Sequence, residues 1–264
     1  MVNIPLFQVD SFTNEPFKGN PAGVCLLPEV RPDTWMRSLA AEMALSETAF
    51  ILKNGGGFSL RWFTPTVEVS LCGHATLASA HILWQKKIVP VDQTIRFTSL
   101  SGLLTASKNG DWIELDFPAR AITAVSENEA VIEALTAVPD ECYQSKDNLL
   151  YVYPDEAVIR RLKPDFAALA GLNYHGIIVT APSANPKYDF VSRFFAPSIG
   201  INEDPVTGSA HCTLAPYWQS RLHKDVMSAY QASARGGELK LRVSGERVYI
   251  SGQAVTLFEA SLKG

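Results

Sequence analysis

The chain has 264 residues, of which 47% are hydrophobic and 19% are charged, a composition typical of a globular protein with a substantial core. Its formal net charge of −4 and its lack of clustered Lys and Arg argue against a nucleic-acid partner, because phosphate neutralisation requires such clusters. We find no signal-like or bilayer-spanning segment, and the four cysteines are too scattered for a disulfide framework, so we expect a cytoplasmic protein with no membrane contact.

The first predicted elements are two strands separated by a turn-rich loop. The strands are Leu6–Asp10 and Gly23–Leu27, and the loop Thr13–Pro21 contains several Asn, Pro and Gly residues. A helix with apolar residues at helical spacing is then predicted to begin at Asp33 and to end near Leu45, with a strand starting at the next residue. The sequence therefore predicts a helix-to-strand junction at this point.

Two hairpin turns predict that the sheet is at least partly antiparallel. They are Asn54–Gly57 and Asn109–Gly110, and each lies between strand-like segments. The pattern breaks after Pro118. We therefore expect two halves, residues 1–120 and 121–264.

The second half is predicted to contain the same kinds of element. Strands and helices are expected at Glu127–Leu135 (helix), Leu149–Tyr153 (strand), Asp155 or Pro164 to Ala170 (helix), Gly176–Ala181 and Tyr188–Phe195 (strands), Ser209–Gln219 (helix), Glu238–Val243, Arg247–Gly252 and Gln253–Leu262 (strands). Strand-rich halves that each hold a central apolar helix predict an α+β fold in which sheets curve around helices.

A short motif occurs twice and suggests that the fold is duplicated. Arg61–Pro65 (RWFTP) returns 132 residues later as Arg193–Pro197 (RFFAP), and each copy leads into a turn and a helix that begins near Gly73 or Gly208. The first N–H groups of a helix are free to bind an anion. If the two helix starts face each other across an approximate two-fold axis, a small anion would be held between them.

Glu47 is the foremost catalytic candidate. It is an isolated carboxylate at the predicted junction, followed by the apolar run Ala49–Leu52. Burial would raise its pKa towards the range in which a group can move protons at neutral pH. The alternative is a surface glutamate at the end of an element.

His74 and Asp204 accompany the two helix starts. His74 follows Gly73, where the helix dipole disfavours the cationic ring and leaves a neutral imidazole that can donate or accept; the alternative is a core histidine, and His81 is assigned to that class. Asp204 precedes Pro205 and is either a turn opener or a proton-active group, and the duplication favours the second interpretation.

Cysteine and histidine residues near the helix starts do not predict a metal site. Cys72 is either a proton-active thiol or a buried small hydrophobe. His211 and Cys212 lie one turn into the second helix, and no further ligand stands at a suitable spacing. We therefore expect no metal.

Four motifs in the same order resemble the phenazine-biosynthesis PhzF-like family. They are Asn20–Val24 (NPAGV), Ser46–Phe50 (SETAF), Arg61–Pro65 with Leu71–Thr76 (RWFTP and LCGHAT), and Glu203–Ala210 (EDPVTGSA). The family is similar in fold to diaminopimelate epimerase and proline racemase. The resemblance implies two pseudo-symmetric halves, each a curved mixed sheet around a central helix, with an active site between them.

The resemblance also implies roles for individual residues. Glu47 would be the catalytic carboxylate, which in the phenazine enzyme moves a proton within a cyclohexadiene carboxylic acid without a cofactor. His74 and Asp204 would join it in catalysis, and the substrate would be bound by Asn20, Gly73, His74, Gly208 and Ser209. The resemblance further implies a possible homodimer.

We therefore expect a cofactor-independent isomerase that acts on a small carboxylate-bearing substrate. One alternative is an amino-acid racemase or epimerase using Cys72, although the second signature has no cysteine before its glycine. Another is a non-catalytic member of the fold that only binds a small molecule. The sequence does not identify the substrate or the pathway.

Overall fold

The computed structural model describes residues 3–146 and 148–263. Its contacts divide the chain into two compact units, the first made of residues 1–117 and 249–264 and the second of residues 118–248. The chain enters the second unit close to the predicted boundary at residue 120. The last strand of the chain, β17 (Ala254–Lys263), was expected in the second half. It belongs to the first unit instead, because it pairs antiparallel with β1 (Asn3–Ser11).

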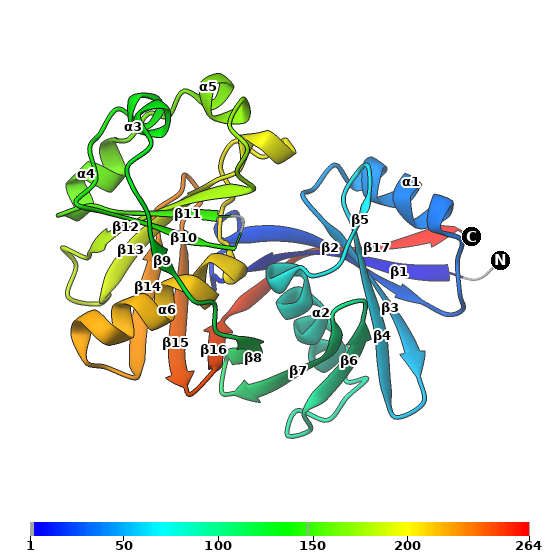
Figure 1. Ribbon diagram of the computed structural model, residues 1–264. Coiled ribbons are helices and arrows are strands. Elements are labelled where there is room, and N and C mark those ends of the chain that lie inside the picture. The colour runs from blue at the N-terminus through cyan, green and yellow to red at the C-terminus, as the bar shows by residue number, and fades with distance from the viewer. Residues whose placement is uncertain (1–2, 147, 264) are drawn as a thin grey trace. The chain divides into compact units, whose positions relative to one another are not determined.

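The first unit is a mixed sheet with two helices (Figure 1). Besides β1 and β17 its elements are β2 (Asn20–Leu27), α1 (Asp33–Met43), β3 (Thr48–Asn54), β4 (Gly57–Phe63), β5 (Glu68–Val69), α2 (Gly73–Gln85), β6 (Ile95–Ser99), β7 (Gly102–Asn109) and β8 (Trp112–Pro118). Antiparallel pairs (β1 with β2, β3 with β4, β6 with β7) are joined by parallel steps (β2 with β3, β4 with β6).

The second unit repeats this pattern. Its elements are β9 (Thr123–Ala124), α3 (Glu129–Leu135), β10 (Glu141–Ser145), β11 (Asn148–Val152), α4 (Glu156–Arg161), α5 (Phe166–Ala170), β12 (Gly176–Pro182), β13 (Phe190–Phe195), a 3-10 turn (Pro197–Ile199), α6 (Gly208–Leu222), β14 (Val226–Gln231) and β15 (Gly237–Ser244). The strand β16 (Arg247–Gly252) begins in the second unit and ends in the first. Antiparallel pairs (β10 with β11, β12 with β13, β14 with β15) again alternate with parallel steps (β11 with β12, β13 with β14). The predicted α+β fold of two similar halves is confirmed.

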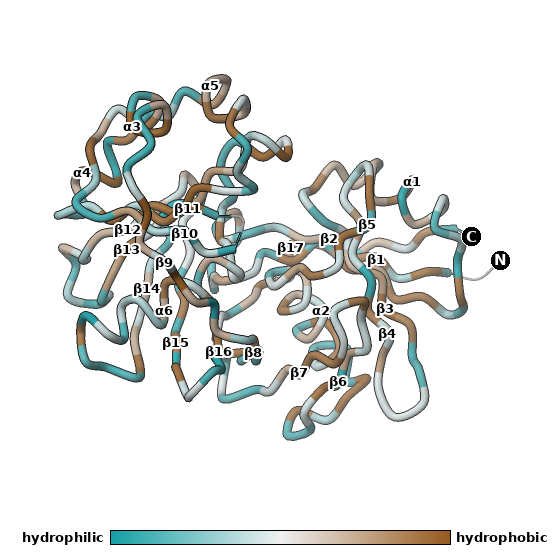
Figure 2. Tube along the Cα trace, in the orientation of Figure 1, coloured by the Kyte–Doolittle hydropathy of each residue, from teal (hydrophilic) through white to brown (hydrophobic). Residues whose placement is uncertain are grey.

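Each unit is built around one apolar helix. α2 buries ten of its residues and packs against β1, β2, β3 and β17, and α6 buries nine and packs against β14 and β15. Figure 2 shows hydrophobic residues along β11, β12 and β13 and hydrophilic ones in the loops around them. Within the described residues, no helix combines the length and the apolar character that crossing a bilayer requires.

The structure also refines several predicted elements. Both hairpins are present, between β3 and β4 and between β7 and β8. The helical region before residue 170 is two short helices, because Pro164 interrupts it and Asp165 starts a second helix by accepting a hydrogen bond from Ala168 N. Asn20 and Pro21, which were expected in a loop, begin β2 and pair with β1.

Candidate active site

Glu47 lies in the short connection between α1 and β3. The helix ends at Ala44, whose left-handed conformation (φ 51°) turns the chain, and β3 begins at Thr48. The Glu47 carbonyl accepts a hydrogen bond from Gly23 N at 3.1 Å, which fixes this connection to β2. Only 14% of the Glu47 side chain is exposed, so the carboxylate sits at the edge of the buried region.

His74 places its ring against that carboxylate. It is the second residue of α2, and the first turn of this helix is held to β1 because Ser11 Oγ donates to the His74 carbonyl at 2.8 Å. Its Nε2 lies 3.4 Å from Glu47 Oε2 and 3.4 Å from Ser46 Oγ. Its Nδ1 lies 3.3 Å from the amide nitrogen of Asn20. The imidazole thus joins the start of β2 to the junction before β3.

Cys72 completes the cluster at the N-cap of α2. Its Sγ lies 3.5 Å from Nδ1 and 3.9 Å from Nε2 of His74, and the thiol also hydrogen-bonds the Glu47 carboxylate. The backbone here is fixed by Thr76, whose Oγ1 donates to the Cys72 carbonyl at 2.5 Å. The structure therefore brings together Glu47, Cys72 and His74, which come from two separate segments of the chain.

The electrostatic setting of Glu47 favours proton transfer. Burial raises the pKa of its carboxyl above the ordinary value, and hydrogen bonds from Ser46 and Cys72 offset part of this rise. If the Asn20 amide donates to Nδ1, the His74 proton is on Nε2, the ring nitrogen that lies 3.4 Å from Glu47 Oε2. A carboxylate whose pKa is raised is better able to take up a proton and release it again.

Sequence reasoning missed some residues that shape this cluster. Ser11 and Ser46 contact His74, and only the adjacency of Ser46 to Glu47 offered a signal. Gly23 is also required by packing, because a Cβ at this position would lie 2.7 Å from Thr48 Oγ1. A larger residue would push β2 away from β3 directly beside Glu47.

The second signature forms a different polar network. Asp204 is 9% exposed, and its carboxylate accepts a short hydrogen bond from Thr207 Oγ1. Gln231 on β14 ties this turn together, because its side chain accepts from Thr207 N and donates to the Asp204 carbonyl, both at 2.8 Å. Nothing in the sequence around Gln231 indicated this role.

The remaining predicted residues of the second helix start lie at the beginning of α6. Gly208 is its first residue and is buried, and Ser209 follows it and is partly exposed. His211 binds the Thr207 carbonyl through Nδ1 at 2.8 Å, and burial lowers its pKa to about 4. Cys212 Sγ donates to the Gly208 carbonyl at 3.8 Å. That Gly73 and Gly208 serve one substrate stays a prediction.

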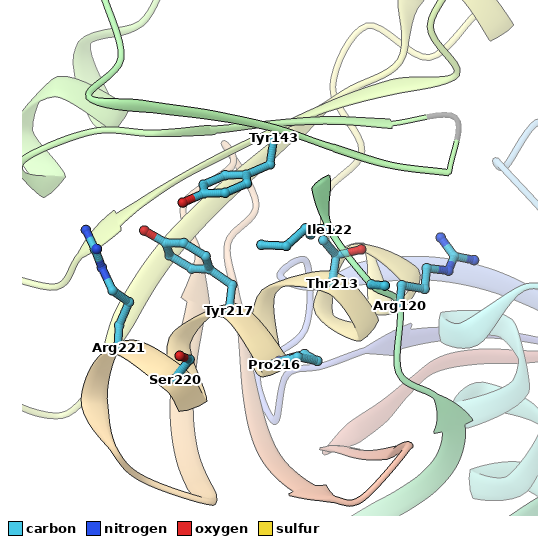
Figure 3. A pocket seen from close by; sticks show the side chains of 9 residues that line it. Arg120, Ile122, Tyr143, Thr213, Pro216, Tyr217, Ser220 and Arg221 are labelled. Atoms are coloured by element: carbon cyan, nitrogen blue, oxygen red, sulfur yellow. The ribbon is translucent and has the colours of Figure 1, made fainter. Parts of the chain in front are cut away.

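A separate pocket of about 400 Å³ lies in the second unit (Figure 3). It is lined by residues of α6, β10 and the segment before β9, namely Arg120, Ala121, Ile122, Tyr143, Thr213, Pro216, Tyr217, Ser220 and Arg221. The hydroxyls of Tyr143 and Tyr217 both donate to Glu141, which also pairs with Arg221. This pocket includes none of the residues that the sequence analysis selected.

The cluster in the first unit also has the composition of a metal-binding group. The ligand atoms of Glu47, Cys72 and His74 all lie within 4.8 Å of one another. Potential ligands at short spacings along the chain predicted no metal site. The group of three is not evident from such spacings, because Glu47 comes from a different segment than Cys72 and His74.

Comparison with known proteins identifies the family. The family model described as "Phenazine biosynthesis-like protein" matches residues 9–260. A protein of Halalkalibacterium halodurans named as an uncharacterized isomerase is 51% identical over 264 residues, which is 99% of each chain. The crystal structure of a PhzF-family phenazine biosynthesis protein from Enterococcus faecalis is 42% identical, with a TM-score of 0.96 and complete coverage of both chains.

The fold extends to more distant proteins. A probable proline racemase from Agrobacterium radiobacter aligns with a TM-score of 0.66 over 98% of this chain and 93% of its own, at 11% identity. This likeness supports the epimerase-like fold that the family resemblance implied. The family-model match and the relatives matched over the whole length show that the chain belongs to the phenazine biosynthesis-like (PhzC–PhzF) protein family.

Proposed function

We propose that this protein is a cofactor-independent isomerase that moves a proton within a small, conjugated carboxylic acid. The observation that carries the proposal is the shielded Glu47 carboxylate, with its raised pKa, 3.4 Å from Nε2 of His74. Support also comes from the relatives, since the Halalkalibacterium halodurans protein is named an isomerase.

In the proposed mechanism Glu47 acts first as a base and then as an acid. The ionised carboxylate removes a proton from a carbon of the substrate, and the electron pair left behind spreads through the conjugated system towards the substrate carboxylate. The Glu47 carboxylic acid then delivers a proton to a different carbon. Because the same group takes and returns the proton, the reaction needs no external acid, base or redox partner.

The surroundings of Glu47 support the charge changes of this cycle. Nε2 of His74 lies 3.4 Å from the carboxylate, and an N–H group at this position would limit the cost of ionising Glu47 in a buried position. The first N–H groups of α2, at Gly73 and His74, suit the negative charge that develops on the substrate. We propose that Asn20, Gly208 and Ser209 contribute to substrate binding, and that Asp204 assists.

The test is deuterium uptake from deuterated water into a panel of conjugated cyclic carboxylic acids and amino acids. We expect Glu47→Gln to lower turnover by about 100-fold or more, the usual contribution of a general acid/base. Glu42→Gln is the matched control, because it makes the same change on the exposed face of the neighbouring helix α1. Normal turnover in Glu47→Gln would exclude the assigned role.

The contact between Cys72 and His74 favours one alternative, a racemase or epimerase that uses the thiol. Its Sγ lies 3.5 Å from the imidazole, within the same cluster as the carboxylate. The same assay separates the two reactions through Cys72→Ser. The proposed isomerase should lose less than about tenfold of its turnover, whereas a racemase that depends on the thiolate should lose its activity, because a serine hydroxyl is a far weaker acid.

A further inference from the structure

We propose that Glu47, Cys72 and His74 form a binding site for Zn²⁺, and that occupation of this site switches the proposed isomerase off. The metal-binding part of this inference is independent of the reaction. The inhibitory part rests on the proposed function, because it requires Glu47 to be the proton-transfer group.

The three side chains supply the ligand types that zinc prefers. Cysteine sulfur, histidine nitrogen and carboxylate oxygen are its usual ligands, and three protein ligands leave a fourth position open to water. Magnesium and calcium, which select oxygen ligands, would be disfavoured by the thiolate. The cluster therefore fits a borderline-soft divalent cation.

The distances also fit one metal ion. Tetrahedral zinc with ordinary bond lengths separates a nitrogen from an oxygen ligand by about 3.3 Å and from a sulfur ligand by about 3.6 Å. The corresponding separations are 3.4 Å between His74 Nε2 and Glu47 Oε2, and 3.9 Å between His74 Nε2 and Cys72 Sγ. These two separations differ from the tetrahedral values by a few tenths of an ångström at most, and all three ligand atoms lie within 4.8 Å of one another.

The ring of His74 can adopt the tautomer that a metal requires. Binding through Nε2 needs the proton on Nδ1, and Nδ1 faces the Asn20 side-chain amide at 3.3 Å. A flip of that amide turns its oxygen towards Nδ1 and makes it the acceptor for the Nδ1–H group. Asn20 would then orient the ligand from outside the coordination sphere, as partners of metal-bound histidines commonly do.

The electrostatics of the cluster favour a divalent cation. Glu47 and Cys72 are both shielded from solvent, and two anions there would be destabilised by burial and mutual repulsion. A bound Zn²⁺ would neutralise both charges, and the helix start beneath Cys72 favours the thiolate form. A carboxylate held by the metal could no longer accept a proton from a substrate, so metal and substrate turnover would exclude each other.

The experiment uses untagged, reduced, full-length protein that has been stripped with a chelator, and Co²⁺ as a spectroscopic probe. We expect one equivalent of Co²⁺ to produce a thiolate-to-cobalt charge-transfer band, which Zn²⁺ then removes. Cys72→Ser should abolish the band, and Cys142→Ala, which alters a buried cysteine of the second unit, should retain it. Glu47→Gln should raise the Kd for Zn²⁺ by more than about 100-fold, since even outer-sphere partners account for 10–100-fold.

A second readout guards against misfolded variants. Zn²⁺ should slow alkylation of Cys72 in the wild-type protein, as measured by peptide mass spectrometry, with circular dichroism verifying the fold of each variant. A Zn²⁺ Kd weaker than about 1 mM, or a cobalt band that persists in Cys72→Ser, would overturn the metal site.

The proposed function and the metal site fail in different ways. Inhibition of deuterium uptake by Zn²⁺ with the Kd found spectroscopically would support both. A cobalt band without any uptake would leave the site standing and remove the reaction. Uptake that Zn²⁺ does not affect at saturating occupancy would overturn the inhibitory part alone.

Discussion

The two units share a scaffold in which equivalent residues make equivalent bonds. Arg61 and Arg193, which match in the repeated motif, each hold a glutamate through two hydrogen bonds, Arg61 to Glu68 and Arg193 to Glu203. Both glutamates stand five residues before the glycine that begins the central helix. The same ion pair therefore anchors the approach to each helix start.

The helix starts themselves are also built alike. Cys72 and Thr207, the residues before the two glycines, have extended backbones, and their carbonyls accept the backbone N–H groups of Thr76 and Ala210. Four residues on, Thr76 Oγ1 binds the Cys72 carbonyl and His211 Nδ1 binds the Thr207 carbonyl. Different side chains thus perform the same structural task, which assigns His211 to the scaffold.

The difference between the units is the cluster of Glu47, Cys72 and His74. Thr48 pairs with Phe63 and Ile177 pairs with Phe195, and these phenylalanines occupy the same place in the repeated motif. The residue equivalent to Glu47 is therefore Gly176, which has no side chain. The ion pair and the start of the central helix are built alike in both units, whereas the grouping of carboxylate, imidazole and thiol occurs in the first.

We expect the largest effect from replacing Arg193, a change that tests whether the two ion pairs contribute equally to the free energy of unfolding. Arg193 is 11% exposed, and besides Glu203 it donates to the carbonyls of Ile159 and Leu162, both at 3.0 Å. Removing it leaves a shielded carboxylate and two carbonyls without donors, so Arg193→Ala should cost about 3 kcal/mol in the free energy of unfolding. Urea denaturation measures this loss.

Arg61→Ala is the matched variant in the first unit. Its side chain is 31% exposed and the pair is more accessible to water, so we expect a loss of about 1 kcal/mol. Equal losses in the two variants would contradict the idea that the second unit depends more strongly on its ion pair.

The sequence allowed the duplicated fold and the central candidate to be predicted, because both depend on local patterns. The repeated motif, the two hairpin turns and the apolar helices appear as patterns in adjacent residues, and Glu47 stands out as a carboxylate in apolar surroundings. The return of β17 to β1 could not be predicted in this way, because strand pairing over the whole chain length leaves no local signal.

The sequence also did not allow the grouping of Glu47, Cys72 and His74 to be predicted. Cys72 and His74 are neighbours in sequence, but their contact with Glu47 depends on where α2 lies against β1 and β2. Gln231 illustrates the same limit in the second unit, since it reaches the Asp204–Thr207 turn from a strand that comes later in the chain. Only tertiary packing brings such residues together.

A smaller effect is expected from Asp204, and it tests whether the chemistry is concentrated in the first unit. Its carboxylate already accepts a hydrogen bond from Thr207, and an asparagine would keep an oxygen for that bond but carry no charge or proton. We expect Asp204→Asn to lower turnover by about tenfold, well short of the loss in Glu47→Gln. Deuterium-uptake kinetics of both variants on the same acid decide this. Equal losses would show that both units contribute proton-transfer groups.

We expect the smallest effect in the pH dependence of protein stability, which reports on the buried carboxyl of Glu47. Burial raises the pKa of Glu47 in the folded protein above its value in the unfolded chain, so the folded state binds this proton more tightly. The resulting stabilisation is fully present below the unfolded pKa, about 4.3, and is lost as the pH rises through the higher folded value. Glu47→Gln does not titrate, so its Tm relative to wild type should increase between pH 4 and pH 7.

Thermal unfolding of both proteins at these two pH values measures the change, with Glu42→Gln on α1 as the control for removing an exposed charge. A Tm difference that stays constant with pH would show that Glu47 is ionised as easily in the folded chain as in the unfolded one. Such a carboxylate would be a poor proton carrier at neutral pH, because it would hold its proton too weakly to return it to carbon. The stability measurement therefore examines the premise of the mechanism without requiring the substrate.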